Sequence, residues 1–427
     1  MNRNDLERLT KDELIELVLR LQRPDKTSRN SSKPPSTDRK ERRENSKPGG
    51  AKPGHEGHSR RLADNPDAFE DHAPTRCDRC GLPFPDDARR ELIGEYDEVE
   101  LPPVRPFVRR HRRFAVRCAC CDKPTSAPLP PAAQGTPFGS NIHALAVYLK
   151  TMQLFSYERL SAAFRDLFGL QVSQGALMNM FARTKAAFAA GRENALVALR
   201  RARVVACDET GARIEGVNAH HWVFCCEDAV VHSAEFTRGA VAVREAMGGH
   251  RPDVWISDRY SAQQGHAARQ QTCLAHLDRE ARFVEENSSD NVVAFRLKLW
   301  LDRAFALARD IETFAASTLS AKRRTLERDL DAILDAATTC PFTRELLAKI
   351  ARARDQLLTF CDFPGEVEAT NNESERRLRP CVIQRKVTNG YRAKWAADNE
   401  AAVRTVVDTA RISGVGPFQT ILGVIGA

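Results

Sequence analysis

Two apolar runs that each end on an aspartate constrain the fold of this chain more than any other feature. Residues 204–208 read Val-Val-Ala-Cys-Asp, and residues 254–258 read Val-Trp-Ile-Ser-Asp. Short β-rich apolar runs bounded by polar residues are typical of buried strands. Asp208 and Asp258 would then stand at strand ends, where a sheet presents its side chains to a cleft. A single aspartate there is more often a turn-forming or capping residue, and only its surroundings distinguish the two roles.

A third acidic stretch, residues 370–380, is typical of the start of a helix and holds two candidate acids, Glu373 and Glu375. Residues two apart on a helix point about 200° apart, so only one of them faces a given cleft. Glu375 shares a face with the apolar Leu378, three residues later. Glu373 instead completes Thr370-x-x-Glu373, which predicts a capping box with a local structural role. We therefore predict Glu375 as the third acid.

The three acids Asp208, Asp258 and Glu375 are hard oxygen ligands of the kind that Mg²⁺ or Mn²⁺ prefers. Two such ions about 3.5–4 Å apart are the usual arrangement for in-line attack at phosphate. The sequence therefore predicts a catalytic site with two ions and phosphoryl transfer on a nucleic acid. Basic residues that follow the third acid would line its rim and contact a phosphate backbone: Arg376, Arg379, Arg385 and Lys386.

The order of the predicted elements indicates a ribonuclease-H-like α/β fold. After the first strand come two likely antiparallel strands at 221–226 and 230–236, a helix at 241–247, and the strand that ends on Asp258. In that fold the first and fourth strands lie side by side, which would bring Asp208 and Asp258 together. We assign residues 201–280 and 361–427 to this catalytic domain. Residues 281–360 form an all-α insertion, predicted from amphipathic stretches at 295–307, 319–334 and 342–360.

Two CxxC pairs predict one structural zinc ion. Cys77 and Cys80 form the first pair and Cys118 and Cys121 the second, and each pair offers two thiolates from one tight turn. The 37-residue gap is long for a zinc motif, but a hairpin made of strand-like segments at 92–100 and 104–116 would fill it. We assign residues 66–123 to a zinc-ribbon domain. Its arginines make it strongly basic, so that contact with nucleic acid is expected, with Arg109 and Arg112 among the candidates.

Cys273 and His276 lie shortly after the second aspartate and allow two interpretations. They could be a metal-binding pair, or they could support the acid site by packing and positioning. No second Cys/His pair lies nearby in the sequence. We favour the supporting role.

The N-terminal region combines a helix and a basic arm. Residues 1–22 predict a leucine-rich helix, which either forms a short dimerising coil or docks on its own domain. Between Arg20 and Arg61 the chain has thirteen Lys and Arg against five Asp and Glu. The Pro-, Gly- and Ser-rich composition of residues 23–65 predicts disorder. Such an arm either binds phosphate backbones, with Lys33 as one contact, or serves as a solvated linker.

Residues 138–200 are predicted to be helical. One helix ends at Gly169, and a second begins near Ser173 and contains Leu177 and Phe181. Two helices joined by a short turn with glycine are similar to a helix-turn-helix. Any helical hairpin imitates this pattern, so both DNA binding and plain packing remain open.

Composition limits the class of protein further. No apolar run approaches the length of a membrane span, and Met1–Asp5 lacks the apolar core of a signal peptide. Twelve cysteines in such a chain indicate thiols and metal ligands rather than a disulfide framework. We expect a multidomain cytoplasmic protein without a membrane partner.

With these residues in place, the chain resembles the transposases of bacterial insertion sequence family sixty-six, large catalytic subunit. The resemblance covers nearly the whole chain. It depends on the arm at 30–36, the four CxxC cysteines, Cys207-Asp208-Glu209-Thr210, Ser257-Asp258-Arg259-Tyr260, Cys273-Leu274-Ala275-His276-Leu277, and the 371–380 stretch with Arg385-Lys386. The order and number of these motifs make the match specific.

The resemblance implies a DDE transposase whose acids are Asp208, Asp258 and Glu375. It implies metal-dependent cleavage of the element's own ends and their joining to target DNA. Small accessory proteins of the element are expected as partners. We also expect a homo-oligomer on DNA.

Two other functions compete with this one. The first is a ribonuclease-H-like nuclease that cleaves DNA without joining it. The second is a zinc-ribbon DNA-binding protein whose catalysis is idle, and the intact acid triad argues against it. The basic arm and the zinc module argue against an enzyme that acts on small molecules.

Overall fold

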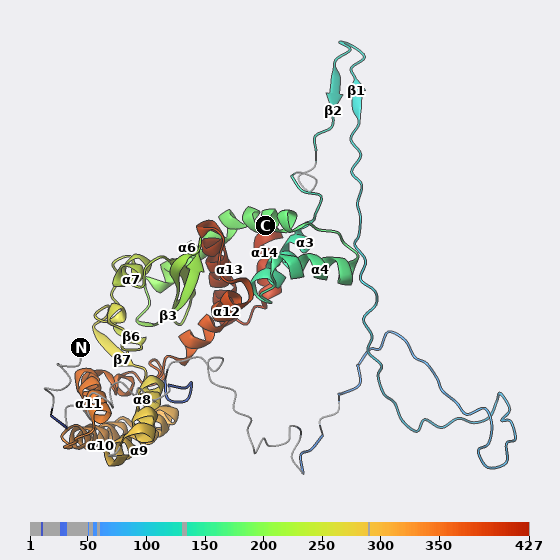
Figure 1. The fold of residues 1–427 in the computed structure, drawn as a ribbon. Helices are drawn as coiled ribbons and strands as arrows, with labels where there is room; N and C mark the ends of the chain where they lie inside the picture. Colours follow the sequence, from blue (N-terminus) through green and yellow to red (C-terminus); the bar gives the residue numbers. More distant parts are fainter. Residues whose placement is uncertain are drawn as a thin grey trace. The chain divides into compact units, whose positions relative to one another are not determined.

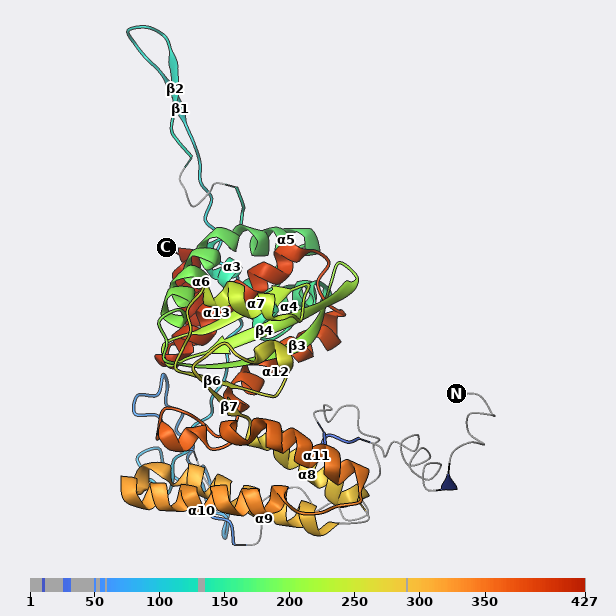
Figure 2. The same cartoon turned by 90° about the vertical axis from the view of Figure 1, so that its left-hand side faces the viewer.

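The computed structural model describes residues 10–11, 26–31, 50, 54–57, 60–129, 135–288 and 291–426. The chain divides into a unit of residues 40–107 and a larger unit formed by the remainder. The larger unit holds every helix and strand named below, and Figures 1 and 2 show it in two orientations. The predicted leucine-rich helix and Lys33 lie outside the described residues, except for Thr10 and Lys11.

A five-stranded sheet forms the centre of the larger unit. Its strands are β3 (Val204–Ile214), β4 (Val217–Cys225), β5 (Val230–Glu235), β6 (Val254–Ser257) and β7 (Arg269–Thr272), in the order β5-β4-β3-β6-β7. The strands β3, β4 and β5 form an antiparallel meander, while β6 is parallel to β3 and β7 is parallel to β6. The helix α7 (Ala240–Met247) connects β5 to β6. The predicted meander, the predicted helix and the adjacency of the first and fourth strands are therefore confirmed.

Successive side chains of β3 point to opposite faces of the sheet and pack into two different apolar cores. Val205 and Cys207 pack with Trp222 and Phe224 of β4 and with α6 (Lys185–Leu199) and α7 on one face. The neighbouring Val204 and Ala206 point to the opposite face, because successive strand residues alternate in direction. Helices thus cover both faces of the sheet, which produces a mixed α/β fold.

The opposite face is covered by helices that come late in the chain. These are α8 (Leu274–Asn287), α12 (Asn372–Thr388) and α13 (Lys394–Ile412). Thr405 and Thr409 of α13 hydrogen-bond the backbone of β5: Thr405 Oγ1 accepts from the His232 N–H at 2.9 Å, and Thr409 Oγ1 accepts from the Val230 N–H at 3.1 Å. The helix α13 therefore satisfies the polar groups of a strand that would otherwise be an open edge.

The segment between the second and third acids is helical, as predicted. It contains α9 (Asn291–Arg309), α10 (Ala316–Leu334) and α11 (Pro341–Ala353). The last predicted helix ends earlier than expected, at Ala353, and two 3₁₀ turns, Arg354–Gln356 and Thr359–Asp362, follow it. The apolar core of these helices is continuous with Val254 and Ile256 of β6, so the helical segment packs on the sheet itself.

A small helical layer precedes the sheet, and its helix pair is confirmed. It consists of α3 (Ser140–Thr151), α4 (Tyr157–Phe168) and α5 (Gln174–Arg183), and the chain ends in α14 (Pro417–Gly426). The backbone of Gly169 is left-handed (φ 61°), which ends α4. Ser173 begins α5 by accepting the N–H of Ala176 at 3.2 Å. No described helix is both long enough and apolar enough to cross a membrane.

Two expectations for the N-terminal third need correction. The stretch 92–100 contains no strand, and within 104–116 only the end belongs to one, the short hairpin of β1 (Ala115–Arg117) and β2 (Pro124–Ser126). Apolar side chains in this stretch have nothing to pack against: Ile93 is 98% and Tyr96 85% exposed. Residues 26–31 of the arm, which composition predicts to be disordered, form a turn in which the buried Asn30 donates to Glu286 of α8 at 2.5 Å.

Candidate functional site

Asp208 does not stand at a strand end as expected but in the middle of β3, because pairing with β4 extends the strand to Ile214. Its side chain lies on the face that α12 covers. The parallel register pairs Ala206 with Ile256, so that Asp208 and Asp258 each stand two residues beyond a paired position. The Asp208 side chain accepts the N–H of Glu209 at 2.9 Å. Burial raises the pKa of Asp208 well above its ordinary value, and the negative charges of Glu209, Asp258 and Glu375 raise it further. The three predicted acids are therefore close enough to interact.

Asp258 follows directly after β6, and local hydrogen bonds fix its position. Its Oδ1 accepts the N–H of Tyr260 at 2.8 Å. Its backbone carbonyl accepts from the hydroxyl of the buried Ser257 at 2.8 Å and from the Gln264 amide at 3.3 Å. The carboxylate stays partly exposed, which leaves it available to a ligand.

Glu375, in the first turns of α12, is held by two side chains of α8. Its Oε1 lies 3.1 Å from Arg279 Nη2 and 3.6 Å from His276 Nε2. In the described part of the chain, the three acids do not have their ligand atoms within 4.8 Å of one another. Ligands of a two-ion site span a wider space than those of a single ion.

Glu373 points away from these acids, although it does not form the predicted capping box. The helix α12 begins after Asn371, and no side chain caps its N-terminus. Glu373 instead pairs with Arg377 at 2.7 Å and with Arg376 at 3.2 Å on its own helix. The capping box is thus wrong, because the helix starts one residue later than that motif requires, whereas Glu373 still has a local partner.

Asn371, which sequence reasoning did not single out as a functional residue, links the elements that carry the acids. Its side-chain amide donates to the carbonyl of Cys207 at 2.8 Å, one residue before Asp208. Its backbone N–H donates to the sulfur of Cys273 at 3.2 Å, and both residues are buried. Cys273 and His276 therefore lie beside the acids and contact residues of the third acidic stretch.

Glu209 is a second residue that the sequence interpretation left out. Its side chain is 2% exposed and points to the face opposite Asp208. Arg238 donates to Glu209 at 2.6 and 2.9 Å, and Gln263 donates to its other oxygen. Burial raises the pKa of Glu209, and the hydrogen bonds from Arg238 oppose that change. The sequence did contain a signal for this role. Glu209 directly follows Asp208 in a predicted strand, and neighbouring strand residues point to opposite faces, so Glu209 has to be accommodated on the other side of the sheet.

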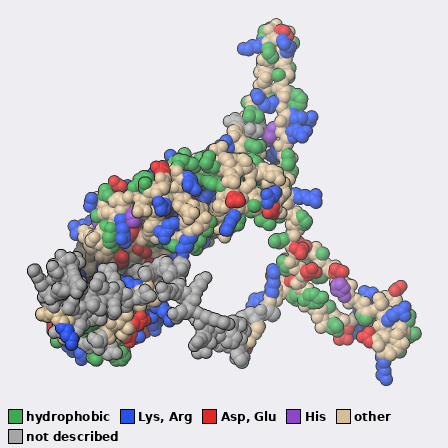
Figure 3. Space-filling view, in the orientation of Figure 1, with side chains coloured by type: hydrophobic (Ala, Val, Ile, Leu, Met, Phe, Trp, Pro, Cys, Tyr) green, Lys and Arg blue, Asp and Glu red, His purple; other side chains and the backbone are tan. Residues whose placement is uncertain are grey.

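The predicted basic rim is present only in part. Arg376, Arg379 and Lys386 are exposed on α12. Arg385 is half-buried and donates to the carbonyl of Gly211 in β3, so it joins the helix to the sheet. Arg109 and Arg112 are exposed in the stretch that leads into the β1–β2 hairpin, along which Figure 3 shows several Lys and Arg side chains.

The two CxxC turns share one backbone conformation. In each turn the first cysteine donates its N–H to the carbonyl five residues later, Cys77 to Leu82 at 2.9 Å and Cys118 to Lys123 at 3.0 Å. In each, the residue four positions on donates back to that cysteine's carbonyl at 2.9 Å and has a left-handed backbone (Gly81, φ 71°; Asp122, φ 53°). By analogy with Cys77 and Cys80, the shared pattern favours Cys118 and Cys121, rather than Cys120, as the candidate metal ligands of the second turn. Hydrogen bonds from the turns lower the pKa of Cys77 and Cys118, which favours thiolates.

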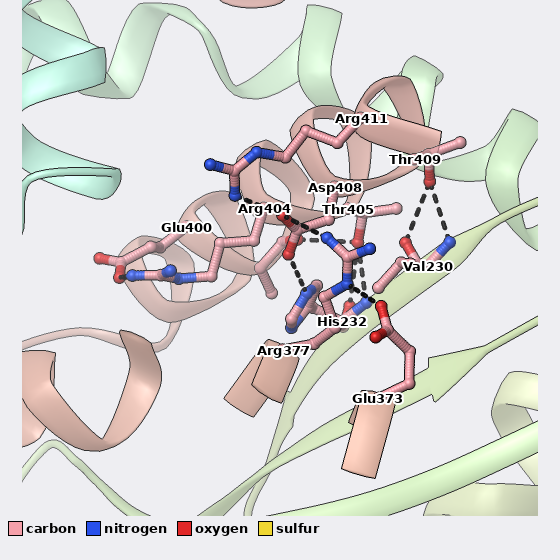
Figure 4. Close-up of polar contacts among 11 residues, drawn as sticks. Val230, His232, Glu373, Arg377, Glu400, Arg404, Thr405, Asp408, Thr409 and Arg411 are labelled. Carbon is pink, nitrogen blue, oxygen red and sulfur yellow. Dashed lines mark hydrogen bonds and ion pairs between the residues drawn. The ribbon is translucent and has the colours of Figure 1, made fainter. Parts of the chain in front are cut away.

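Buried polar residues form a second group between the sheet and α12. His221, His232 and Cys381 lie there, and burial lowers the pKa of both histidines. His232 Nε2 lies 3.0 Å from Asp408 Oδ2, as Figure 4 shows. This group was not anticipated from the sequence, since its members are far apart along the chain.

Comparison with known proteins identifies the family of the chain. No curated protein matches the chain. The sequence model of the Transposase IS66 family matches residues 135–399, a range that contains all three acids. Because this range is more than half of the chain, the protein belongs to the IS66 family of transposases.

Proposed function

We propose that this protein is a DNA transposase that cleaves the ends of its element and joins them to target DNA. The proposal rests on the placement of Asp208 and Asp258 on neighbouring strands, with Glu375 of α12 near enough for its charge to act on Asp208. Asp208 and Asp258 come from neighbouring parallel strands, and Glu375 comes from the helix that covers them. Membership in a transposase family supports this chemistry for the site.

The strand order supports a ribonuclease-H-like catalytic domain. A meander of three antiparallel strands, a helix, and a fourth strand parallel to the first is the arrangement expected for that fold. Because of this arrangement, Asp208 and Asp258, which are fifty positions apart in sequence, reach the same end of the sheet. The helical segment 281–360 separates the second acid from the third without disturbing this arrangement.

The acid site fits Mg²⁺ or Mn²⁺. Its donors are carboxylate oxygens, and burial together with repulsion from neighbouring acids raises the pKa of Asp208, a cost that divalent cations would offset. Asp208, Asp258 and Glu375 would hold two ions, which activate the attacking oxygen and stabilise the leaving oxygen when bound. Arg279 and His276 hold the Glu375 carboxylate in place, and Asn371 fixes the start of α12 against β3.

DNA would be bound by basic residues around the site and in the N-terminal third. The residues concerned are Lys33, Arg109, Arg112, Arg376, Arg379 and Lys386. We withdraw Arg385 from this set, since its guanidinium is engaged with Gly211. The second helix of the pair, α5, exposes Gln174 at its start and Asn179 in its middle, and these polar side chains are suited to a groove contact.

The four cysteines Cys77, Cys80, Cys118 and Cys121 would bind one structural zinc ion. Two turns with the same knuckle conformation, each offering a pair of sulfur atoms, match the needs of a Cys₄ site. The ion would complete a zinc ribbon from segments that lack a core of their own. A homo-oligomer assembled on DNA and the small accessory proteins of the element complete the proposal.

A cleavage assay on DNA that carries the inverted repeats flanking the gene tests the proposal. Asp208→Asn, Asp258→Asn and Glu375→Gln should each reduce Mg²⁺-dependent cleavage by about 10²–10³-fold or more, the loss typical of removing one electrostatic group from a transition state. Binding of the ends should change little. Glu373→Gln is the matched control and should cleave normally. Loss of cleavage in Glu373→Gln with normal cleavage in Glu375→Gln would reverse the assignment of the third acid.

The same assay separates the alternatives. A transposase joins the cleaved 3′ end to a second DNA, whereas a nuclease of the same fold releases it. Cleavage without any joined product would support the nuclease. Binding with neither reaction, in the wild type, would support a catalytically idle DNA-binding protein.

A further inference from the structure

The strands place two histidines and one cysteine together beneath α12. His221 in β4 and His232 in β5 lie on the same face, because the register pairs Val223 with His232 and His221 with Ala234. Their rings lie 5.5 Å apart between centroids. Cys381 of α12 approaches from above, and the potential ligand atoms of the three residues all lie within 4.8 Å of one another. All three residues are buried.

The position of Cys381 follows from how α12 packs. Leu378, one turn earlier, shares a buried cluster with Val223 and Cys225 of β4 and Val230 of β5. Residues three apart on a helix share a face, so Cys381 points to the same two strands. Two strand residues and one helix residue thus meet by regular geometry, without any special loop.

The hydrogen bonding of this group is incomplete. Neither ring nitrogen of His221 has a partner in the described part of the chain, although the side chain is 1% exposed. His232 binds Asp408 through Nε2 at 3.0 Å, whereas its buried Nδ1 has no described partner. Buried polar groups without partners are rare and cost about 1–3 kcal/mol each. A bound cation would use these nitrogens.

The pairing of His232 with Asp408 has the form of a metal-binding histidine. Such a histidine usually donates its second ring N–H to a carboxylate, which orients the ring and makes it a better ligand. Asp408 is itself held by Arg411 at 3.3 Å and Arg377 at 3.5 Å, and Figure 4 shows these side chains gathered around it. The free Nδ1 of His232 is then the ligand atom.

The charges around the group permit a divalent ion. Arg404 is the buried cation that acts electrostatically on His221 and Cys381. It is paired with the buried Glu400 at 2.8 Å, so that the pair is neutral. Metal binding would convert the Cys381 thiol to a thiolate and offset one charge of the ion.

We infer that His221, His232 and Cys381 bind one zinc-class cation, a structural site distinct from the acid site and from the CxxC cysteines. Two imidazoles and one thiolate form a donor set that suits Zn²⁺, whereas Mg²⁺ and Mn²⁺ prefer oxygen. A small pocket that His221 and Cys381 line together with Gln384 and Tyr391 adjoins these ligands.

The ion would attach α12 to the sheet next to Pro380, where the helix lacks a backbone hydrogen bond. Pro380 lies inside α12 and removes one backbone hydrogen bond of the helix. The ion would bind the next residue, Cys381, and fasten this part of the helix to β4 and β5. Glu375 lies six residues earlier on α12, so the ion would also steady the helix that carries the third acid.

Metal analysis of the full chain tests the inference. In a variant in which Cys77, Cys80, Cys118, Cys120 and Cys121 are all changed to Ser, we expect one equivalent of zinc per chain. Adding Cys381→Ser or His221→Gln to that variant should reduce the zinc to less than about a tenth of an equivalent. Adding Cys225→Ser, a buried cysteine of β4 outside the group, is the matched control and should leave the zinc in place.

Cobalt substitution supplies a second readout that does not depend on how stable the variants are. The five-serine variant loaded with Co²⁺ should show a thiolate-to-cobalt absorption band, because Cys381 is then the predicted sulfur ligand. A folded five-serine variant that holds no zinc and shows no such band would overturn the inference. Full zinc in the Cys381→Ser variant would overturn it equally. Neither result bears on the acids, whose function is read from DNA cleavage.

Discussion

The α/β core and the cysteine-rich stretch (residues 66–123) differ in what holds their structures together. In the core, both faces of the sheet are covered, and Trp222, Phe224 and Trp255 are completely buried. In the cysteine-rich stretch, Ile93, Tyr96 and Leu101 are each at least 85% exposed, and no strand forms around them. Both stretches contain apolar residues of similar kind. Only the core has enough chain around those residues to bury them.

The comparison shows two ways in which metal ions can serve one protein. In the core, apolar side chains are buried on both faces of the sheet, and burial together with the charges of neighbouring carboxylates raises the pKa of Asp208, a cost that bound cations would offset. The cysteine-rich stretch forms two turns but no core, so an ion would supply the missing cohesion. Metal would therefore serve chemistry at the acid site and folding at the CxxC cysteines.

Removal of zinc from the CxxC cysteines should have the largest effect, confined to one region. Structural zinc contributes about 10–16 kcal/mol in small zinc modules. Cys77→Ser should therefore remove amide-exchange protection from residues 66–123 and leave the sheet protected. Hydrogen exchange read by mass spectrometry measures both regions at once. Cys120→Ser is the control and should change nothing, and equal protection in the wild type and in Cys77→Ser would contradict the zinc ribbon.

Replacing Asn371 should weaken the core and leave the cysteine-rich stretch unaffected. Asn371→Ala leaves the carbonyl of Cys207 without its donor, at a cost of about 1–3 kcal/mol. The Tm should fall, and cleavage should fall with it, because the start of α12 loses its link to β3. The exposed neighbour Asn372 offers a matched control in Asn372→Ala. Equal Tm values for the two variants would show that the hydrogen bond from Asn371 to Cys207 contributes nothing to stability.

Asp208→Asn should stabilise the core in the absence of metal. Because burial and like charges raise the folded pKa of Asp208 above the unfolded value of about 4, its ionised form costs stability. That cost is absent below the unfolded pKa, grows as the pH rises through the folded pKa, and persists above it. The Tm of Asp208→Asn should thus exceed that of the wild type at neutral pH, by about 2–4 °C for each 1 kcal/mol, and the gain should vanish near pH 4.

Magnesium should reverse that difference, since it binds the wild type and stabilises it by mass action. Asp228→Asn, in an exposed turn, is the control for charge removal alone. A lower Tm for Asp208→Asn at neutral pH without metal would show that Asp208 is stabilising, and the repulsion among the acids would then be refuted.

Glu373→Gln should have the smallest effect. Glu373 makes partly exposed pairs with Arg376 and Arg377 on its own helix, and such pairs contribute about 0.2–1 kcal/mol. Thermal unfolding should show a fall in Tm of a few degrees at most. A fall as large as that of Asn371→Ala would mean that Glu373 has a role in holding α12 that its local contacts do not explain.

Local patterns predicted the elements of the core well, because alternation and helical periodicity are recorded in neighbouring residues. The strands that carry Asp208 and Asp258, the helix pair around Gly169 and the helices of residues 291–353 all follow from them. The same reasoning failed for residues 92–100, where the composition suits a strand. A strand needs a partner, and the local sequence does not show whether one is within reach.

The sequence by itself determined which residue types the protein has for chemistry: three acids, four cysteines in two turns and a series of arginines. The tertiary structure decided which of them meet. It directed Arg385 to Gly211 rather than outward, gave Asn371 its link to Cys207, and gathered His221, His232 and Cys381 from two strands and a helix. These contacts join residues from 11 to 174 positions apart along the chain. Such pairings depend on how elements pack, which no local pattern records.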